Sequence, residues 1–151
     1  MEAKLIFSTN IANADQLEIH LLCCNNKFVP KLSTKVNIKQ YAQKLREKAM
    51  SFECWDNNKL IGFIGIYFNQ KELGVAFISN LSVYESYSGK GIASQLLTNC
   101  IDYATLSGFK QIQLEVNSNN LVALNFYKKH KFVHLYSIQE AQFLSYQIIN
   151  K

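Results

Sequence analysis

A glycine-rich turn at residues 88–93, with the sequence S-G-K-G-I-A, has the residue types and spacing of an anion-binding site. It follows a β-like segment that ends at Val83 and precedes the helix-like run A-S-Q-L-L. Because Gly89 and Gly91 have no side chains, backbone N–H groups can converge on an anion there. The first turn of a helix adds unpaired N–H donors and the positive end of its dipole. The turn therefore predicts a site for a phosphorylated ligand.

Two common nucleotide-binding motifs do not fit this turn. A P-loop requires Gly-Lys-Ser or Gly-Lys-Thr, whereas Gly89 and Lys90 are followed here by Gly91. A dinucleotide-binding fingerprint needs glycine or alanine where Ser94 stands, in an early strand–helix–strand unit with an acidic residue further on. A tight turn without any ligand remains the alternative to an anion site.

A third pattern, Gln/Arg-x-x-Gly-x-Gly/Ala, fits the turn better. It is the acyl-CoA pyrophosphate loop of the GNAT-type N-acetyltransferase superfamily, which the turn resembles at Gly91 and Ala93 while departing from it at Ser88. The segment V-N-S-N-N-L-V-A-L-N-F-Y-K-K-H-K-F at residues 116–132 is similar to the strand, loop and helix of the same family. We therefore interpret the chain as resembling GNAT acetyltransferases.

The resemblance implies a mixed α/β fold in a single N-acetyltransferase domain over residues 1–151. The implied sheet is mostly antiparallel, with about seven strands flanked by about four helices, and two of its strands splay apart to bind coenzyme A. These two strands are expected at residues 74–83 and 111–116. Backbone groups around Leu81, Ser82 and Val83 would then hold the pantetheine arm, with one N–H facing the thioester oxygen.

The implied co-substrate is acetyl-CoA, and the turn would hold its phosphates. The positions expected to bind it are Ser88, Gly89, Lys90, Gly91, Ile92, Ala93, Ser94 and Asn120. Asn120 matches a family asparagine beside coenzyme A, and the alternative is that it caps a helix. Tyr127 matches the tyrosine that relatives often use as the general acid for the departing thiolate, and a phenol with a pKa near ~10 is protonated at neutral pH. Its alternative role is packing or a contact with pantetheine.

A general base cannot be assigned from the sequence. Some relatives carry a glutamate at the strand position that Phe77 occupies, and phenylalanine accepts no proton. The candidates that remain, each acting only through water, are Glu53, Asp56, Glu72, His20 and His134. Asn80 is polar in an apolar strand, so it is expected either to face the acceptor or to be a hydrogen-bonded core residue.

The implied function is transfer of an acetyl group from acetyl-CoA to a primary amine of a small molecule, by direct attack in a ternary complex. Residues 27–45 resemble small acetyltransferases associated with bacterial surface-sugar synthesis, which implies an amino-sugar nucleotide as acceptor. The alternatives are a catalytically silent acyl-CoA-binding regulatory module, an acetyltransferase acting on a peptide or protein amine, and a basic interaction domain.

Composition narrows the expected partners and location. The chain has 151 residues, 48% of them hydrophobic, which suffices for one core. Its formal net charge is +5, but the lysines are scattered, so no nucleic-acid partner is expected. No run approaches transmembrane length, so a cytoplasmic protein without a membrane partner is expected. The run F-L-S-Y-Q-I-I-N is expected at a sheet edge, where it would allow a homodimer.

The four cysteines are expected to be free thiols, since Cys54 and Cys100 lie in strand-like and helix-like patterns typical of buried residues. His20, Cys23 and Cys24 would share one helical face, which raises a metal site as an alternative. No second pair of ligands accompanies them, so no metal is expected.

Apolar periodicity and turn residues predict the elements that must position these groups. Helices are expected at residues 12–24, 36–49, 92–106 and 120–129. Asn13 or Asp15 would cap the first helix and Asn37 the second. Strands are expected at residues 4–8, 51–55, 60–68, 74–83, 111–116, 132–136 and 143–149. The second and third of these strands are expected to form a hairpin across D-N-N-K.

Overall fold

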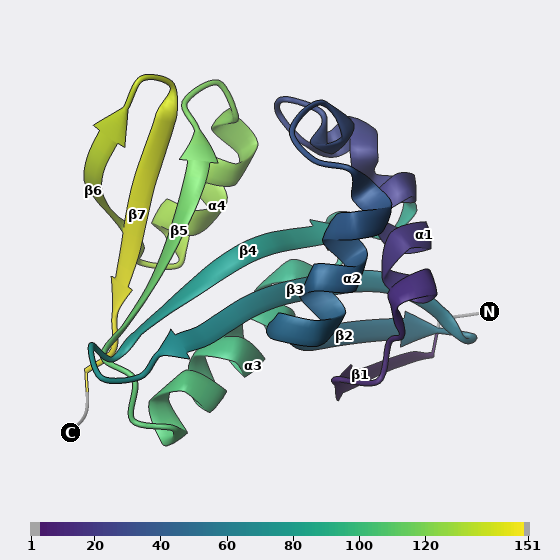
Figure 1. The fold of residues 1–151 in the computed structure, drawn as a ribbon, viewed down its shortest axis with the longest axis horizontal. Coiled ribbons are helices and arrows are strands. Elements are labelled where there is room, and N and C mark those ends of the chain that lie inside the picture. The colour runs from purple at the N-terminus through teal and green to yellow at the C-terminus, as the bar shows by residue number, and fades with distance from the viewer. Residues whose placement is uncertain (1–3, 150–151) are drawn as a thin grey trace.

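The computed structural model describes residues 4–149 and contains a seven-stranded sheet with helices on both faces (Figure 1). The strands are β1 (Leu5–Thr9), β2 (Met50–Asp56), β3 (Lys59–Gln70), β4 (Val75–Val83), β5 (Gln111–Asn117), β6 (Val133–Ile138) and β7 (Ala141–Gln147). The α-helices are α1 (Ala14–Cys24), α2 (Ile38–Lys48), α3 (Ile92–Leu106) and α4 (Leu121–Lys129). The expected elements are confirmed in type and order, with small differences at their ends.

The strands lie in the order β1-β2-β3-β4-β5-β7-β6. Every neighbouring pair is antiparallel except β4 and β5, which are parallel. This confirms the mixed α/β fold with a mostly antiparallel sheet. The expected place of F-L-S-Y-Q-I-I-N is wrong, however, because β7 lies between β5 and β6 and so is not an edge strand.

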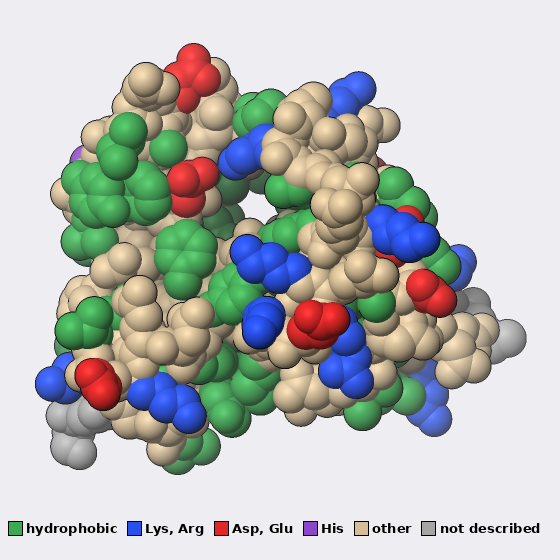
Figure 2. All heavy atoms as spheres, in the orientation of Figure 1, with side chains coloured by type: hydrophobic (Ala, Val, Ile, Leu, Met, Phe, Trp, Pro, Cys, Tyr) green, Lys and Arg blue, Asp and Glu red, His purple; other side chains and the backbone are tan. Residues whose placement is uncertain are grey.

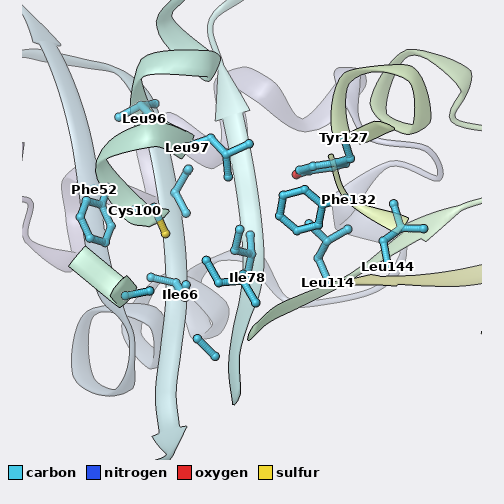
Figure 3. Packing of buried hydrophobic residues seen from close by; sticks show 14 of the residues in the cluster. Phe52, Ile66, Ile78, Leu96, Leu97, Cys100, Leu114, Tyr127, Phe132 and Leu144 are labelled. Carbon is cyan, nitrogen blue, oxygen red and sulfur yellow. The ribbon is translucent and has the colours of Figure 1, made fainter. Parts of the chain in front are cut away.

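Two hydrophobic clusters hold the helices against the sheet. On one face, α1 and α2 pack against β3 through a cluster that includes Leu17, Leu45 and Phe63. On the other face, α3 packs through a cluster that includes Leu96 and Cys100 and extends to α4 (Figure 3). Burying one large aliphatic side chain contributes about 1.5–3 kcal/mol, so these clusters fix the layers. No helix within residues 4–149 is long and apolar enough to cross a membrane.

A bulge in β4 divides the sheet into two parts. The register between β3 and β4 shifts between Ile78 and Asn80, which leaves Ser79 as an extra residue. β4 pairs with β5 only over Val75–Ile78. Beyond that point the two strands separate, as Figure 1 shows. The splayed strand pair is therefore confirmed, and the bulge lies where the splay begins.

The buried carboxylate of Glu53 ties the segment before α1 to the sheet. It accepts hydrogen bonds of 2.6–3.2 Å from the backbone N–H groups of Ile11 and Ala12 and from the side chains of Ser8, Ser51 and Trp55. Its side chain is fully buried. A carboxylate that is enclosed by donors is a structural anchor, so Glu53 is not placed to act as a base.

We expect Glu53→Gln to lower the free energy of unfolding by about 2 kcal/mol, because one accepting oxygen becomes an NH2 group that faces other donors. Chemical denaturation measures this difference. Glu47→Gln makes the same change on the exposed surface of α2 and should shift the free energy by less than about 0.5 kcal/mol. Equal stability of the two variants would contradict the anchoring role.

Candidate functional site

The glycine-rich turn leads directly into α3. Gly91 is the N-cap residue, with φ of 79°, and Gly89 has φ of 76°. Both lie in the left-handed region, which costs a residue with a side chain about 1–2 kcal/mol. A Cβ at either position would meet no atom within 4 Å. The backbone conformation rather than packing therefore favours glycine, and the space beside the turn is open to a ligand.

The N-terminus of α3 differs from those of the other α-helices. In α1, α2 and α4 an asparagine side chain accepts a hydrogen bond from an N–H of the first turn; these residues are Asn13, Asn37 and Asn120. Among the described residues, no side chain caps α3 in this way. Its first-turn N–H groups are therefore not occupied by a side-chain cap, as those of the other α-helices are. Asn120 has the capping role that was the alternative to binding coenzyme A.

Lys27, from the connection after α1, reaches the same turn. Its Nζ donates to the Val83 carbonyl at 2.9 Å and to Ser88 Oγ at 3.2 Å. The Val83 carbonyl therefore already accepts one hydrogen bond from a side chain. Sequence reasoning missed Lys27, because a contact between residues 56 positions apart leaves no local pattern.

The other side chains of the turn point in different directions. Ser94 Oγ lies 3.0 Å from Nε2 of His130, at the end of α4. Lys90 Nζ lies over the ring of Tyr87, 5.3 Å from its centroid. The side chain of Ile92 is buried in the core. Ile92, one of the expected phosphate-binding positions, could therefore contact a phosphate only through its backbone N–H.

A cleft of about 370 Å³ opens where β4 and β5 separate. Four parts of the chain line it: the connection between α1 and α2, the diverging ends of β4 and β5, α4, and the β6–β7 turn. Figure 2 shows the molecule hollowed between its two halves, with basic and acidic side chains on opposite rims. Lys35 of the α1–α2 connection and Glu115 of β5, both lining residues, form an ion pair of 3.5 Å.

Tyr127 of α4 lines the cleft and is 6% exposed. Its ring packs edge to face against Phe126 and Phe132, with centroids 5.2 and 5.3 Å away. Figure 3 shows Tyr127 beside Phe132. Burial raises the pKa of its phenol well above the usual value, and the Cys100 thiol acts in the same direction. The phenol is therefore protonated at neutral pH, as a proton donor requires.

Asn80 and Ser82 follow the bulge on β4. Asn80 and its neighbour Leu81 line the cleft. Ser82 Oγ lies 2.9 Å from Oδ1 of Asn80 and 2.8 Å from Nε2 of His20 on α1. Asn80 therefore has the hydrogen-bonded core role that was one of its two expected roles; it is 6% exposed and also borders the cleft.

The acid and base candidates that were expected to act through water are absent from the cleft lining; these are Glu53, Asp56, Glu72, His20 and His134. The carboxylates that do line it belong to Glu115 and Glu140, which sequence reasoning missed. Phe77 pairs with Gln113 in the closed part of the two strands and does not line the cleft.

The four cysteines are free thiols, as expected. His20, Cys23 and Cys24 lie at helical spacing on α1, but Cys23 is exposed whereas His20 and Cys24 are buried. Both ring nitrogens of His20 have hydrogen-bond partners. Within residues 4–149, no group of three or more His, Cys, Asp or Glu side chains is placed to hold a metal ion.

Comparison with known proteins identifies the family to which a chain with this architecture belongs. The acetyltransferase (GNAT) family matches residues 15–132, which is most of the chain. The chain belongs to the GNAT family. This GNAT protein is 33% identical over 87 residues to streptothricin acetyltransferase A of Bacillus subtilis (strain 168), a match that covers 58% of the chain and 49% of that protein. The chain spans less than half the length of each curated relative it matches, from 49% of the first down to 19%.

Solved GNAT structures share the fold at low sequence identity. The ribosomal-protein-S18-alanine N-acetyltransferase of Escherichia coli has a TM-score of 0.77 and 18% identity, covering 98% of this chain and 96% of that one. The PaiA N-acetyltransferase of Thermoplasma acidophilum, solved in complex with coenzyme A, has a TM-score of 0.76 and 15% identity, covering 95% of this chain and 99% of that one. These likenesses show the fold.

Proposed function

We propose that this GNAT protein transfers an acetyl group from acetyl-CoA to a primary amine of a small molecule, within a ternary complex. The observation that carries the proposal is the cleft that the bulge at Ser79 opens between β4 and β5, with Tyr127 in its wall. The N–H groups at the start of α3 would hold the pyrophosphate. Backbone groups around Leu81 and Ser82 would hold the pantetheine arm.

Acetyl transfer needs an amine nucleophile, a proton donor for the departing thiolate and a hydrogen-bond donor to the thioester oxygen. Residues of the cleft could supply the second and third of these. The amine nitrogen bonds to the acetyl carbon, the carbon–sulfur bond breaks, and the nitrogen loses a proton to solvent water, from which the phenol that protonates the thiolate regains its own. The departing thiolate takes a proton, for which the protonated phenol of Tyr127 is the donor. A strand N–H would stabilise the negative charge that develops on the thioester oxygen.

The charges on the cleft rim support a cationic amine as acceptor. Glu115 and Glu140 both line the cleft, and Lys35 pairs with Glu115. A protonated amine is attracted to such carboxylates before it loses its proton. The relative named streptothricin acetyltransferase supports a small-molecule acceptor. An amino-sugar nucleotide, which residues 27–45 imply, is a second class of small acceptor, although its phosphates would meet these carboxylates.

Two alternatives keep the same fold. The structural neighbour named for the alanine of ribosomal protein S18 supports a peptide or protein amine as acceptor. A catalytically silent module that binds acyl-CoA is supported by Phe77, which stands where some relatives carry a glutamate, and by Ser88 in place of the usual arginine or glutamine.

A panel of amines separates these possibilities. Acetyl-CoA consumption, followed by thiol release, should be accelerated by one acceptor class among polyamines and other small cationic amines, amino-sugar nucleotides, and peptides. Acetyl-CoA binding is measured in parallel by calorimetry. Turnover on a small amine supports the proposal, and turnover only on peptides supports the first alternative. Tight binding without turnover on any amine would favour the silent module.

A further inference from the structure

A buried chain of hydrogen bonds joins α1 to the bulge of β4. His20 is fully buried on α1. Its Nδ1 lies 2.9 Å from the carbonyl oxygen of Leu60, and its Nε2 lies 2.8 Å from Ser82 Oγ. Ser82 Oγ in turn lies 2.9 Å from the side-chain amide of Asn80, which lines the cleft. The chain of hydrogen bonds thus runs from the interior of the molecule to the wall of the cleft.

The chemistry of the partners determines the protonation of His20. A carbonyl oxygen only accepts hydrogen bonds, so Nδ1 must carry a hydrogen that it donates to Leu60. Burial lowers the pKa of His20 to about 4, although hydrogen bonding to the backbone groups of Leu60 and Ser82 acts in the opposite direction. The ring is therefore neutral at pH 7, and Nε2 has only a lone pair. The contact of 2.8 Å at Nε2 then requires the hydroxyl hydrogen of Ser82.

The single hydrogen of the Ser82 hydroxyl decides the orientation of Asn80. If Ser82 donated its hydrogen to Oδ1 of Asn80, the lone pairs of Ser82 Oγ and His20 Nε2 would face each other across 2.8 Å with no hydrogen between them, which is unfavourable. With the hydroxyl donating to His20, the contact of 2.9 Å to Asn80 must take its hydrogen from the amide NH2. The amide then turns Nδ2 toward Ser82 and Oδ1 away from it.

We propose that His20 and Ser82 are positioning residues that hold Asn80 with its Oδ1 toward the cleft, where it accepts a hydrogen bond from the acceptor amine. This inference rests on the proposed amine acetylation. An amine that attacks through its lone pair has N–H groups to satisfy, and it gains positive charge as the new bond forms. An oxygen acceptor stabilises both. An NH2 group in the same place would donate to the lone pair instead and oppose the attack.

Nuclear magnetic resonance tests the hydrogen-bond order independently of any activity. The chain has three histidines, so the His20 ring signals can be assigned by their loss in His20→Gln. Long-range proton–nitrogen spectra of the whole protein at pH 7 should show His20 as the neutral tautomer with the hydrogen on Nδ1. A hydrogen on Nε2, or a doubly protonated ring, would reverse the order and overturn the proposal.

Kinetics with the amine found in the panel tests the role of Asn80. Ser82→Ala removes the link and frees the amide to rotate, so KM for the amine should rise roughly tenfold while the Kd of acetyl-CoA is unchanged. Ser82→Thr keeps the hydroxyl and should recover most of this loss. Ser107→Ala, on the exposed end of α3, is the matched control and should behave as the wild type. An unchanged KM in Ser82→Ala would overturn the proposal.

Two substitutions of His20 separate positioning from proton transfer. A glutamine can donate to Leu60 and accept from Ser82, as a neutral imidazole does, but it cannot take up a proton. The leucine of His20→Leu can neither donate to Leu60 nor accept from Ser82. The KM for the amine should therefore be closer to the wild-type value in His20→Gln than in His20→Leu. Equal loss in both variants, with folding intact, would overturn the positioning role. Failure of the proposed function would be seen separately, as no turnover by the wild type on any amine.

Discussion

Tyr127→Phe should lower turnover by roughly 100-fold or more while leaving the affinity for acetyl-CoA nearly unchanged. The substitution removes only the phenol oxygen, and the ring contacts with Phe126 and Phe132 remain. Without a protonated donor, the thiolate would have to leave unprotonated or take its proton from water. Steady-state rates of thiol release, together with calorimetric binding of acetyl-CoA, measure the two quantities separately.

The control for this substitution is Tyr103→Phe. Tyr103 lies on α3, is 41% exposed, and packs against Phe52 and Phe68 away from the cleft lining. It should turn over at the rate of the wild type. If Tyr127→Phe also turned over at that rate, Tyr127 would have only its packing role, and the proton would come from another group or from water.

Gly91→Val should weaken the binding of acetyl-CoA by roughly 100-fold or more, because its side chain would occupy the space through which a phosphate must approach the first-turn N–H groups of α3. That space is open now, since a Cβ at Gly91 would meet no atom within 4 Å. The substitution should also lower the free energy of unfolding by about 1–2 kcal/mol, because a β-branched residue is strained at a φ of 79°.

Gly108→Val is a matched control for Gly91→Val. Gly108 has φ of 83°, a Cβ there would also meet no atom within 4 Å, and it follows the other end of α3. The two variants should lose similar stability, but only Gly91→Val should lose affinity in calorimetric titrations. Equal affinities in the two variants would mean that the turn does not hold the phosphates.

The periodic parts of this chain could be predicted well because their signals are local. Apolar spacing placed α3 at residues 92–106, which agrees with Ile92–Leu106 in the structure. The side chains of Asn13 and Asn37 cap their helices, as their positions suggested. The left-handed backbone at Gly91 follows from a property of one residue type in one turn. Each of these features depends on neighbours within a few residues.

The bulge at Ser79 could not be located from the sequence, because residues 75–78 are all apolar and do not show which face each one occupies. In the structure Ala76, Ile78, Leu81 and Val83 all lie in or against one hydrophobic cluster, with a shift of one position between the two pairs. Because side chains on a strand alternate between faces, such a shift indicates an extra residue. Reading it as one continuous strand located β4 correctly but missed the point at which the strands separate.

The sequence by itself therefore determined the elements, their order, the family resemblance and the turn that opens α3. Only the tertiary structure decided which side chains meet at the cleft. Lys35 and Glu115 are 80 positions apart, His20 and Ser82 are 62 apart, and no local pattern records either pair. Propensity and periodicity report the conformation and burial of each segment, whereas such contacts exist only because packing brings separate segments together, and the chemistry of the site depends on those contacts.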